Sequence, residues 1–269
     1  FYNIKTYDID ESKCNATHEE VCVDSEIIFV CLPTPMRKDG SCDTRILQGE
    51  LSLIDWEIET LIHNKNRKKQ NPVVVIKSTI PPGTTRALSK TLNFKNIDLC
   101  FSPEFLTEAN SFEDFKNQSR IIIGSDSMSA STIVADMFKK VFSDIPIVMT
   151  SPENAEMTKY FINCFLATKV TFANQMYQIC LDNNIIYDDV KRLALLDKRI
   201  GGSHLMVPGP DGDRGFGGHC FPKDLAAMIE FGSKNNTNPS LLKEVQNFNN
   251  KVRRDRDWEN MKGRAVSED

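Results

Sequence analysis

The chain has 269 residues, 40% of them hydrophobic, which suits one large domain or two smaller ones around a buried core. A net charge of −4 gives no general attraction for nucleic acid or for an anionic membrane surface, so we expect neither partner. The longest apolar runs, such as residues 27–32 and 73–76, are far too short to span a bilayer.

The eight cysteines are scattered along the chain, with no CxxC pair and no spacing typical of a metal site. In a chain of this length and apolar content, scattered cysteines indicate reduced thiols rather than a disulfide framework. We therefore expect a cytoplasmic protein without a bound metal.

The first 148 residues alternate between short runs rich in β-branched residues and segments with helical periodicity, such as 46–63 and 127–141. The expected strands are residues 3–7, 27–31, 73–77, 97–101, 120–124 and 145–149. Strands that alternate with helices predict an α/β fold with a doubly wound parallel sheet. In such sheets ligands bind beyond the carboxyl ends of the strands.

A dinucleotide-binding sheet normally opens with a strand and a glycine-rich turn, but the sequence contains no GxGxxG. We therefore interpret residues 3–7 as the second strand of a Rossmann-like sheet whose first strand is missing. Asp8 follows this run and offers a carboxylate where such folds bind the ribose hydroxyls of adenosine.

Beyond residue 150 the pattern becomes helical. Residues 152–183 predict one long helix, because Pro152 suits a first turn and apolar residues recur at helical spacing. Further helices are expected at 188–196, 222–231 and 239–252, and the polar tail after residue 253 is expected to fray. The predicted organisation is a Rossmann-like domain at 1–149, an all-helical central domain at 150–253 and a polar tail at 254–269.

The most informative motif is Gly-Phe-Gly-Gly-His-Cys-Phe-Pro-Lys-Asp at residues 215–224. Pro222 suits the first position of a helix, which puts Cys220 just before the helix N-terminus. The backbone N–H groups and the dipole of the helix favour the thiolate there, and Lys223 adds a cation. Cys220 is therefore a candidate nucleophile, and the alternative is a buried structural cysteine in a loop that enters a helix.

Two further pairs could contribute chemistry. Lys159 and Asn163 are one helical turn apart and could together bind a developing oxyanion, or they could be a solvent-facing lysine and a polar residue of a helix. Glu104 and Glu108 follow an expected strand and could bind a polyol, act as a base or cap the next helix. The segment 77–85 combines hydroxyls with a diproline turn and suits the polar groups of a cofactor.

Six segments, taken together, carry a resemblance to a known family. They are residues 31–35 (CLPTP), 78–85 (STIPPGTT), 103–108 (PEFLTE), 159–166 (KYFINCFL), 199–201 (RIG) and 215–224 (GFGGHCFPKD). In this order they resemble the signatures of the UDP-glucose dehydrogenase family, whose relatives act on GDP-mannose and UDP-N-acetylated sugars. The resemblance implies a four-electron oxidation with two NAD⁺ in succession, from UDP-glucose to UDP-glucuronate. GDP-mannose or a UDP-N-acetylhexosamine is the alternative substrate.

By residue matching, the resemblance implies that Cys220 attacks the aldehyde and carries a thiohemiacetal and then a thioester. It implies oxyanion binding by Lys159 and Asn163, handling of an ordered water by Asp224 and Lys159, and general base catalysis by Glu104. The implied NAD contacts are Asp8, Lys13, Leu32, Pro33, Thr34, Ser78, Thr79, Glu108 and Lys223. The implied sugar-nucleotide contacts are Phe105, Leu106, Arg199, Phe216 and Gly217.

The resemblance also implies a homodimer formed through the helix at 152–183, with Arg199 offered to the neighbouring subunit. The family's first strand with its glycine-rich turn and its C-terminal nucleotide-binding domain have no counterpart in this sequence. The loop at 206–213 is longer than the family pattern. We therefore expect weak NAD binding, and the alternative outside enzymes is a catalytically silent paralogue or fragment.

Overall fold

The computed structural model describes residues 3–67, 71–106 and 110–268, which form two compact units. Unit 1 comprises Phe1–Pro33 and Thr44–Lys159, and unit 2 comprises Thr34–Asp43 and Tyr160–Asp269. The boundary falls inside one continuous helix, α6 (Pro152–Asp182), whose first eight residues belong to unit 1. Among the described residues, no helix combines the length and the apolarity that crossing a bilayer requires.

Unit 1 is built on a five-stranded sheet whose strands lie side by side in chain order. The strands are β1 (Ile27–Val30), β2 (Val73–Ile76), β3 (Asp98–Phe101), β4 (Ile121–Gly124) and β5 (Ile147–Thr150). β1, β2 and β3 are parallel, and so are β4 and β5. The β3–β4 junction is antiparallel, with Phe101 opposite Gly124. The doubly wound α/β fold is confirmed, but the sheet is mixed rather than wholly parallel.

Residues 3–7, which the sequence predicts as a strand, belong to no ladder in the structure. In the six-stranded Rossmann order 3-2-1-4-5-6, the second strand of the fold pairs with its first strand, which carries the glycine-rich turn and is not β1 of this sheet. The sequence holds no glycine-rich first strand, so this pairing partner is missing. Consequently β1 forms an edge of the sheet, and its Phe29 is 41% exposed.

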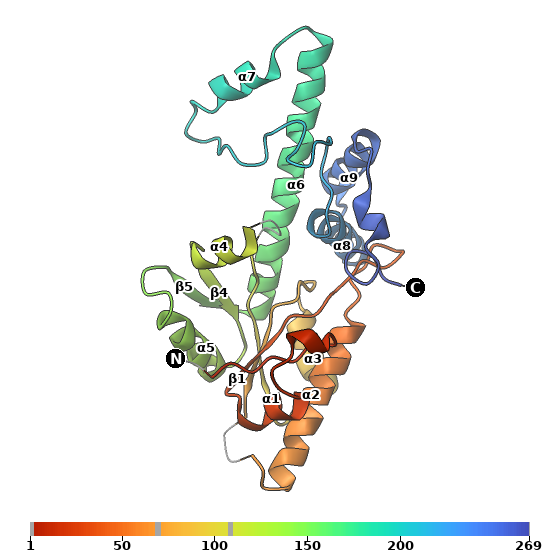
Figure 1. The fold of residues 1–269 in the computed structure, drawn as a ribbon. Helices are drawn as coiled ribbons and strands as arrows, with labels where there is room; N and C mark the ends of the chain where they lie inside the picture. Colours follow the sequence, from red (N-terminus) through yellow and green to blue (C-terminus); the bar gives the residue numbers. More distant parts are fainter. Residues whose placement is uncertain (1–2, 68–70, 107–109, 269) are drawn as a thin grey trace. The chain divides into compact units, whose positions relative to one another are not determined.

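Helices cover both faces of this sheet (Figure 1). One face packs against α1 (His18–Asp24), α2 (Arg45–His63) and α3 (Thr84–Leu92), and the other packs against α5 (Met128–Lys139). Unit 1 also contains the short elements η1 (Glu11–Lys13) and α4 (Ser111–Lys116). Along β2, Val74 and Ile76 join the first cluster and Val73 and Val75 join the second. Because side chains alternate along a strand, a strand covered on both faces needs apolar residues at every position.

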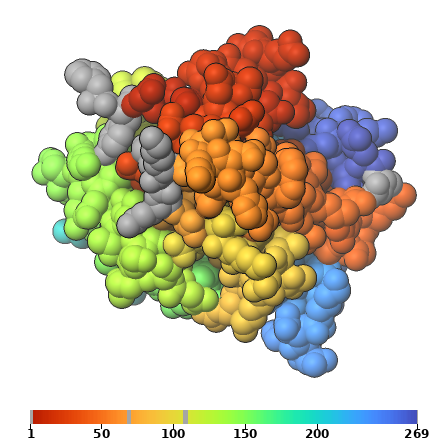
Figure 2. Space-filling model, turned by 90° about the horizontal axis from the view of Figure 1, so that it is seen from below, coloured from red at the N-terminus to blue at the C-terminus, as the bar shows by residue number. Residues whose placement is uncertain are grey.

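The N-terminal segment, drawn red in Figure 2, lies beside α2, drawn orange. His18 fixes this contact, because its Nδ1 lies 2.9 Å from Glu57 Oε2 and its Nε2 lies 3.0 Å from Glu50 Oε1. The hydrogen bond to Glu50 raises the pKa of His18; burial opposes this change, and Glu57 adds to it. α1 is therefore attached to α2 through an imidazole whose two ring nitrogens both contact carboxylates.

The helix α3 begins after Gly83 without a capping side chain of its own. The fully buried carboxylate of Glu156 on α6 accepts hydrogen bonds from Gly83 N at 2.5 Å, Thr85 N at 2.8 Å and Thr85 Oγ1 at 2.6 Å. Every helix start leaves N–H groups without partners inside the helix. Here a side chain 71 residues further along the chain supplies the acceptor.

Unit 2 is helical, as predicted. Its helices are the later part of α6, α7 (Tyr187–Ala194), α8 (Cys220–Lys234) and α9 (Ser240–Val252), with the short η3 (Asp257–Asn260) after them. The long helix predicted at 152–183 is confirmed almost residue for residue as α6. α8 begins two residues earlier than the sequence predicts, so Pro222 is its third residue rather than its first. The core contains Phe216, Leu225 and Val245 from the glycine-containing loop, α8 and α9.

The segment after residue 253 does not fray, in contrast to the prediction from its polar composition. Trp258 is 6% exposed and Ala265 is 1% exposed. Met36 N donates to Ala265 O, and Ser267 N donates to Met36 O, each at 2.8 Å. The buried Trp258 and the backbone pairing with the 34–43 segment hold this segment in place although most of its residues are polar. An argument from average composition does not register the effect of a single buried tryptophan.

Candidate active site

In unit 1, polar residues gather where the parallel strands β1, β2 and β3 end. Leu32 N donates to Ser78 Oγ at 2.8 Å, which joins the segments that follow β1 and β2. Ser102 N donates to Ile76 O at 2.9 Å and joins the segment that follows β3. Two of the predicted NAD contacts, Leu32 and Ser78, are therefore brought together at the carboxyl edge, where sheets of this kind bind ligands.

The Glu104 carboxylate and the Lys159 ammonium form an ion pair in unit 1. Lys159 Nζ lies 3.0 Å from Glu104 Oε1 and donates to the backbone oxygen of Glu104 at 2.7 Å. The other carboxylate oxygen accepts Leu106 N at 2.6 Å, and the Phe105 ring lies 5.7 Å from the ammonium. Lys159 is 3% exposed, so it is not the solvent-facing lysine of the alternative interpretation.

A second lysine at this edge, Lys77, was not singled out by the sequence argument. Its Nζ donates to Pro103 O at 3.2 Å and lies 3.5 Å from Ser102 Oγ. Burial lowers the pKa of Lys77 to about 8. A lysine directly after the apolar run of β2 was the signal available in the sequence, because a cation at a buried strand end needs a specific set of partners.

In unit 2, Asp224 connects two predicted site residues. Its Oδ2 accepts Asn163 Nδ2 at 2.6 Å, and its Oδ1 accepts Lys223 Nζ at 2.6 Å. Asp224 is 1% exposed, and the other two residues are also buried. Burial alone would lower the pKa of Lys223, but the neighbouring Asp224 raises it, with smaller contributions from the Cys42 and Cys220 thiols. The lysine is therefore held as a cation close to the thiol.

Cys220 is the first residue of α8 and is half-buried. The helix backbone places Cys220 and Asp224 one turn apart on the same face. His219 occupies the N-cap position, and its side chain makes no capping hydrogen bond. Cys220 therefore belongs to the first turn of α8, and the N-terminus of a helix is a position that favours negative charge.

The remaining predicted residues lie in different surroundings. Asp8, Lys13 and Pro33 are exposed; Thr34 is buried in unit 2; Thr79 is half-buried in unit 1; Glu108 lies outside the described residues. Lys13 pairs with Asp10 at 3.1 Å, and the exposed Arg199 pairs with Asp197 at 2.5 Å. The ring of Phe216 packs inside the core of unit 2, edge to face with Phe221.

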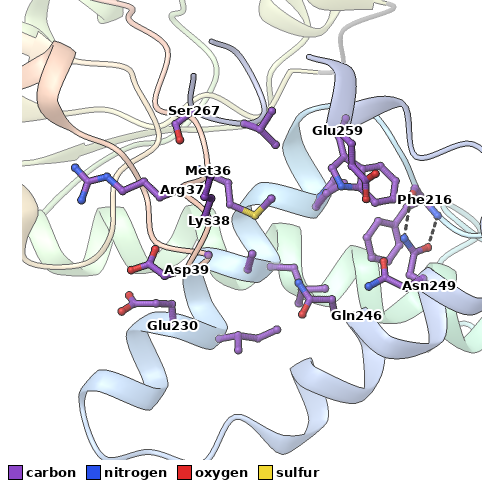
Figure 3. Close-up of a pocket in the computed structure, with 18 of the residues that line it drawn as sticks. Met36, Arg37, Lys38, Asp39, Phe216, Glu230, Gln246, Asn249, Glu259 and Ser267 are labelled. Atoms are coloured by element: carbon purple, nitrogen blue, oxygen red, sulfur yellow. Dashed lines mark hydrogen bonds between the residues drawn. The ribbon is translucent and has the colours of Figure 1, made fainter. Parts of the chain in front are cut away.

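Unit 2 also contains a pocket of about 680 Å³ (Figure 3). From α8 it is lined by Pro222, Leu225, Ala226, Ile229, Glu230 and Ser233. Successive residues of a helix are about 100° apart, so these residues occupy the face of α8 opposite Cys220 and Asp224. The pocket is therefore separate from the candidate catalytic face.

A doubly wound sheet with polar groups at its carboxyl edge, together with a helical unit that presents a thiol at a helix start, places the chain in the dinucleotide-binding α/β class. Residues 6–142 match the NAD binding domain of the UDP-glucose/GDP-mannose dehydrogenase family, and residues 153–251 match its central domain. The chain belongs to this family.

Individual relatives agree with this assignment. The chain is 33% identical to UDP-glucose 6-dehydrogenase TuaD of Bacillus subtilis over 85% of this chain and 47% of that protein. It is 31% identical to UDP-glucose 6-dehydrogenase AglM of Haloferax volcanii over 91% of this chain and 57% of that protein. The structure of a UDP-glucose dehydrogenase from Pyrobaculum islandicum matches with a TM-score of 0.76 and 32% identity, over 87% of this chain and 52% of the other. The chain thus spans about half the length of these relatives.

Proposed function

We propose that the protein oxidises the primary alcohol of a nucleotide sugar to a carboxylate, from UDP-glucose to UDP-glucuronate, with Cys220 as the nucleophile. The observation that carries the proposal is the buried pair Lys223 and Asp224 on the helix that Cys220 begins, with Asn163 of α6 bound to Asp224. Buried ion pairs cost desolvation free energy, so a buried charged group beside a thiol marks a candidate functional site. The names of the relatives favour UDP-glucose among the candidate substrates.

The residues present fit the ribose of adenosine and the part of NAD⁺ that lies at the carboxyl edge of the sheet, but the start of α3 does not fit the pyrophosphate. The exposed carboxylate of Asp8 can accept ribose hydroxyls, and the Leu32–Ser78 junction supplies polar groups at the carboxyl edge of the sheet. The start of α3 cannot serve the pyrophosphate, because Glu156 already occupies its N–H groups. NAD⁺, when bound, accepts the hydride in each of the two oxidations.

The proposed role of Cys220 follows from the chemistry of an aldehyde. The alcohol first loses a hydride and a proton, and the Cys220 sulfur then bonds to the carbon of the resulting aldehyde. The thiohemiacetal loses a second hydride and its hydroxyl proton to give a thioester. Water then adds to the thioester, and the carbon–sulfur bond breaks to release the carboxylate and the thiolate. Covalent attachment keeps the reactive aldehyde on the enzyme between the two oxidations.

The buried polar groups suit the remaining steps. We assign Lys159 and Asn163 to the oxyanion that forms in each addition, because both are N–H donors. Glu104, already oriented by Lys159 and by Leu106 N, is assigned as the general base for water. Asp224 holds the Asn163 amide and, with Lys159, handles the proton of the ordered water.

We also propose that the protein is a homodimer that pairs through α6. Large apolar side chains on this helix are exposed at positions 161, 165, 172 and 179. Spacings of four and seven residues place them on one stripe of the helix. A contiguous apolar stripe of this kind is typical of a surface that another protein covers.

We further propose a location in the cytoplasm, because the free thiols of the cysteines suit a reducing compartment.

The test follows NADH absorbance when the purified protein is incubated with NAD⁺ and UDP-glucose, GDP-mannose or a UDP-N-acetylhexosamine. We expect two NADH per sugar with UDP-glucose and none in Cys220→Ala. Cys180→Ala, at a buried cysteine of the same unit that has no proposed role, should keep the wild-type stoichiometry. A flat trace with every sugar would favour a catalytically silent protein. Full acid production in Cys220→Ala would remove this residue from the role of nucleophile.

A further inference from the structure

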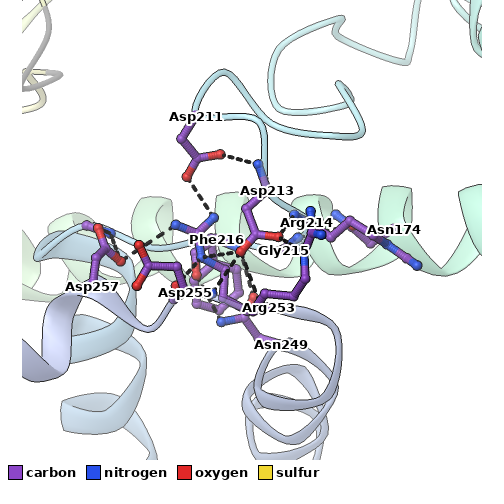
Figure 4. A network of polar contacts seen from close by, with 12 residues as sticks. Asn174, Asp211, Asp213, Arg214, Gly215, Phe216, Asn249, Arg253, Asp255 and Asp257 are labelled. Carbon is purple, nitrogen blue, oxygen red and sulfur yellow. Dashed lines mark hydrogen bonds and ion pairs between the residues drawn. The ribbon is translucent and has the colours of Figure 1, made fainter.

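The loop that leads to Cys220 is held by side chains rather than by backbone pairing (Figure 4). Gly215 N donates to Asn174 Oδ1 at 3.1 Å. Phe216 N donates to Asn249 Oδ1 at 2.7 Å, and Asn249 Nδ2 returns a hydrogen bond to Phe216 O at 2.9 Å. Both asparagines are almost fully buried, with exposed fractions of 1% and 2%. α6 and α9 thus each contribute one amide that binds this loop.

The third contact comes from the segment after α9. Gly218 N donates to the Asp257 carboxylate, at 3.1 Å from Oδ1 and 3.0 Å from Oδ2. Arg253 lies 3.6 Å from Asp257 and 2.7 Å from Asp211. Its buried guanidinium therefore links the Asp257 carboxylate to Asp211 at the start of the loop. A Cβ on Gly217 would overlap both Arg253 and Asp257, so a larger residue at that position would displace this pair of side chains.

The start of the loop is anchored in the same way. Asp213 accepts Arg214 N at 2.8 Å, Asp255 N at 2.9 Å and Arg254 N at 3.0 Å. Burial alone would raise the pKa of Asp213, but these backbone hydrogen bonds and the Arg254 side chain lower it well below its usual range. The carboxylate therefore stays ionised and keeps the loop joined to the end of α9.

These contacts use the backbone N–H groups of residues 214, 215, 216 and 218, so the protein itself satisfies these four donors of the loop. A glycine-containing loop that bound a ligand through its backbone would keep such donors available. The contacts instead fix the loop up to Gly218, two residues before Cys220, and so restrain the backbone that enters α8 at the thiol. Small displacements of a reacting group can lower a rate about 100-fold.

We propose that Asp257, together with Asn249 and Asn174, is a positioning residue for Cys220, acting through the backbone of residues 215–218. The inference rests on the proposed function, because it assigns these residues a role in the attack of the thiol on the sugar aldehyde. Asp257 gives the sharpest test, because its side chain is 30% exposed and its removal leaves no buried cavity.

The experiment compares Asp257→Ala, Asp257→Asn and the control Glu259→Gln in the intact chain. Glu259 lies in the same short element and pairs with Arg256 at 3.3 Å, so the control variant leaves the loop contacts in place. We expect kcat to fall at least tenfold in Asp257→Ala, with KM for NAD⁺ and for the sugar nucleotide changed less than twofold. Asp257→Asn keeps an oxygen for Gly218 N and should remain within about threefold of wild type. Glu259→Gln should match wild type.

A second readout does not depend on turnover. Alkylation of Cys220 by iodoacetamide, followed on its own peptide by mass spectrometry, should slow at least threefold in Asp257→Ala, because a loosened helix start stabilises the thiolate less. Wild-type kcat and alkylation rates in Asp257→Ala would overturn the positioning role. So would equal losses in Asp257→Asn and Asp257→Ala, or a lowered melting temperature with unchanged kinetics. If wild type produced no NADH with any sugar, the proposed function would fail, and alkylation would still decide the role of Asp257.

Discussion

The capping of α3 by Glu156 leads to a quantitative prediction for stability. In Glu156→Ala, Gly83 N and Thr85 N lose their acceptor inside the protein. An unsatisfied buried N–H costs roughly 1–3 kcal/mol. Thr85 is buried, whereas Gly83 is half-buried and can recover a hydrogen bond to water. We therefore expect the free energy of unfolding to fall by roughly 3 kcal/mol, with a melting temperature about 6–12 °C lower for a domain of this size.

The matched control is Glu153→Ala, one turn earlier on the same helix. Glu153 Oε1 lies 2.5 Å from Arg86 at the surface, and Arg86 also pairs with Asp126. An exposed ion pair contributes only about 0–1 kcal/mol. Urea unfolding of both variants, with amide exchange at residues 83–86, measures the difference. Equal unfolding free energies for the two variants would refute the assignment of Glu156 as the cap.

Two further predictions concern α1 and α6. The pKa of His18 is raised in the folded protein, so its contribution to stability is complete below pH 6.5 and is lost as the pH rises through the folded-state value. The gap in unfolding free energy between wild type and His18→Gln should therefore narrow from pH 6 to pH 9, and a gap independent of pH would contradict it. Phe165→Glu should reduce the mass measured by light scattering from dimer to monomer, whereas Leu241→Glu, at an equally exposed leucine on α9, should not; a wild-type monomer would rule out the α6 interface.

The sequence predicts best where one local pattern determines one element. The length of α6 follows from helical spacing over 31 residues and from Pro152 in its first turn. The burial of β2 follows from its unbroken Val-Val-Val-Ile. Such patterns need no knowledge of distant residues, so they can be derived from the chain alone.

The predictions were wrong where the outcome depends on a partner elsewhere in the chain. Residues 3–7 have strand propensity but no neighbouring strand to pair with. The segment after residue 253 has polar composition, yet Trp258 is buried. The motif around Cys220 indicated a helix start, whereas Asn174, Asn249 and Asp257, which hold the loop before it, carried no local signal. Their importance lies in contacts between residues up to 41 positions apart, and no periodicity records such contacts.

The two faces of α8 offer separate routes for chemical probes. An electrophile would react with Cys220 on one face, whereas a reversible compound could occupy the concave surface on the other face without touching sulfur. Phe216 and Asn249 form part of the wall of that surface (Figure 3). A small molecule bound between these two residues would break the hydrogen bonds that hold the loop before Cys220. A screen for ligands of this pocket could therefore find inhibitors that act on the thiol without contacting it.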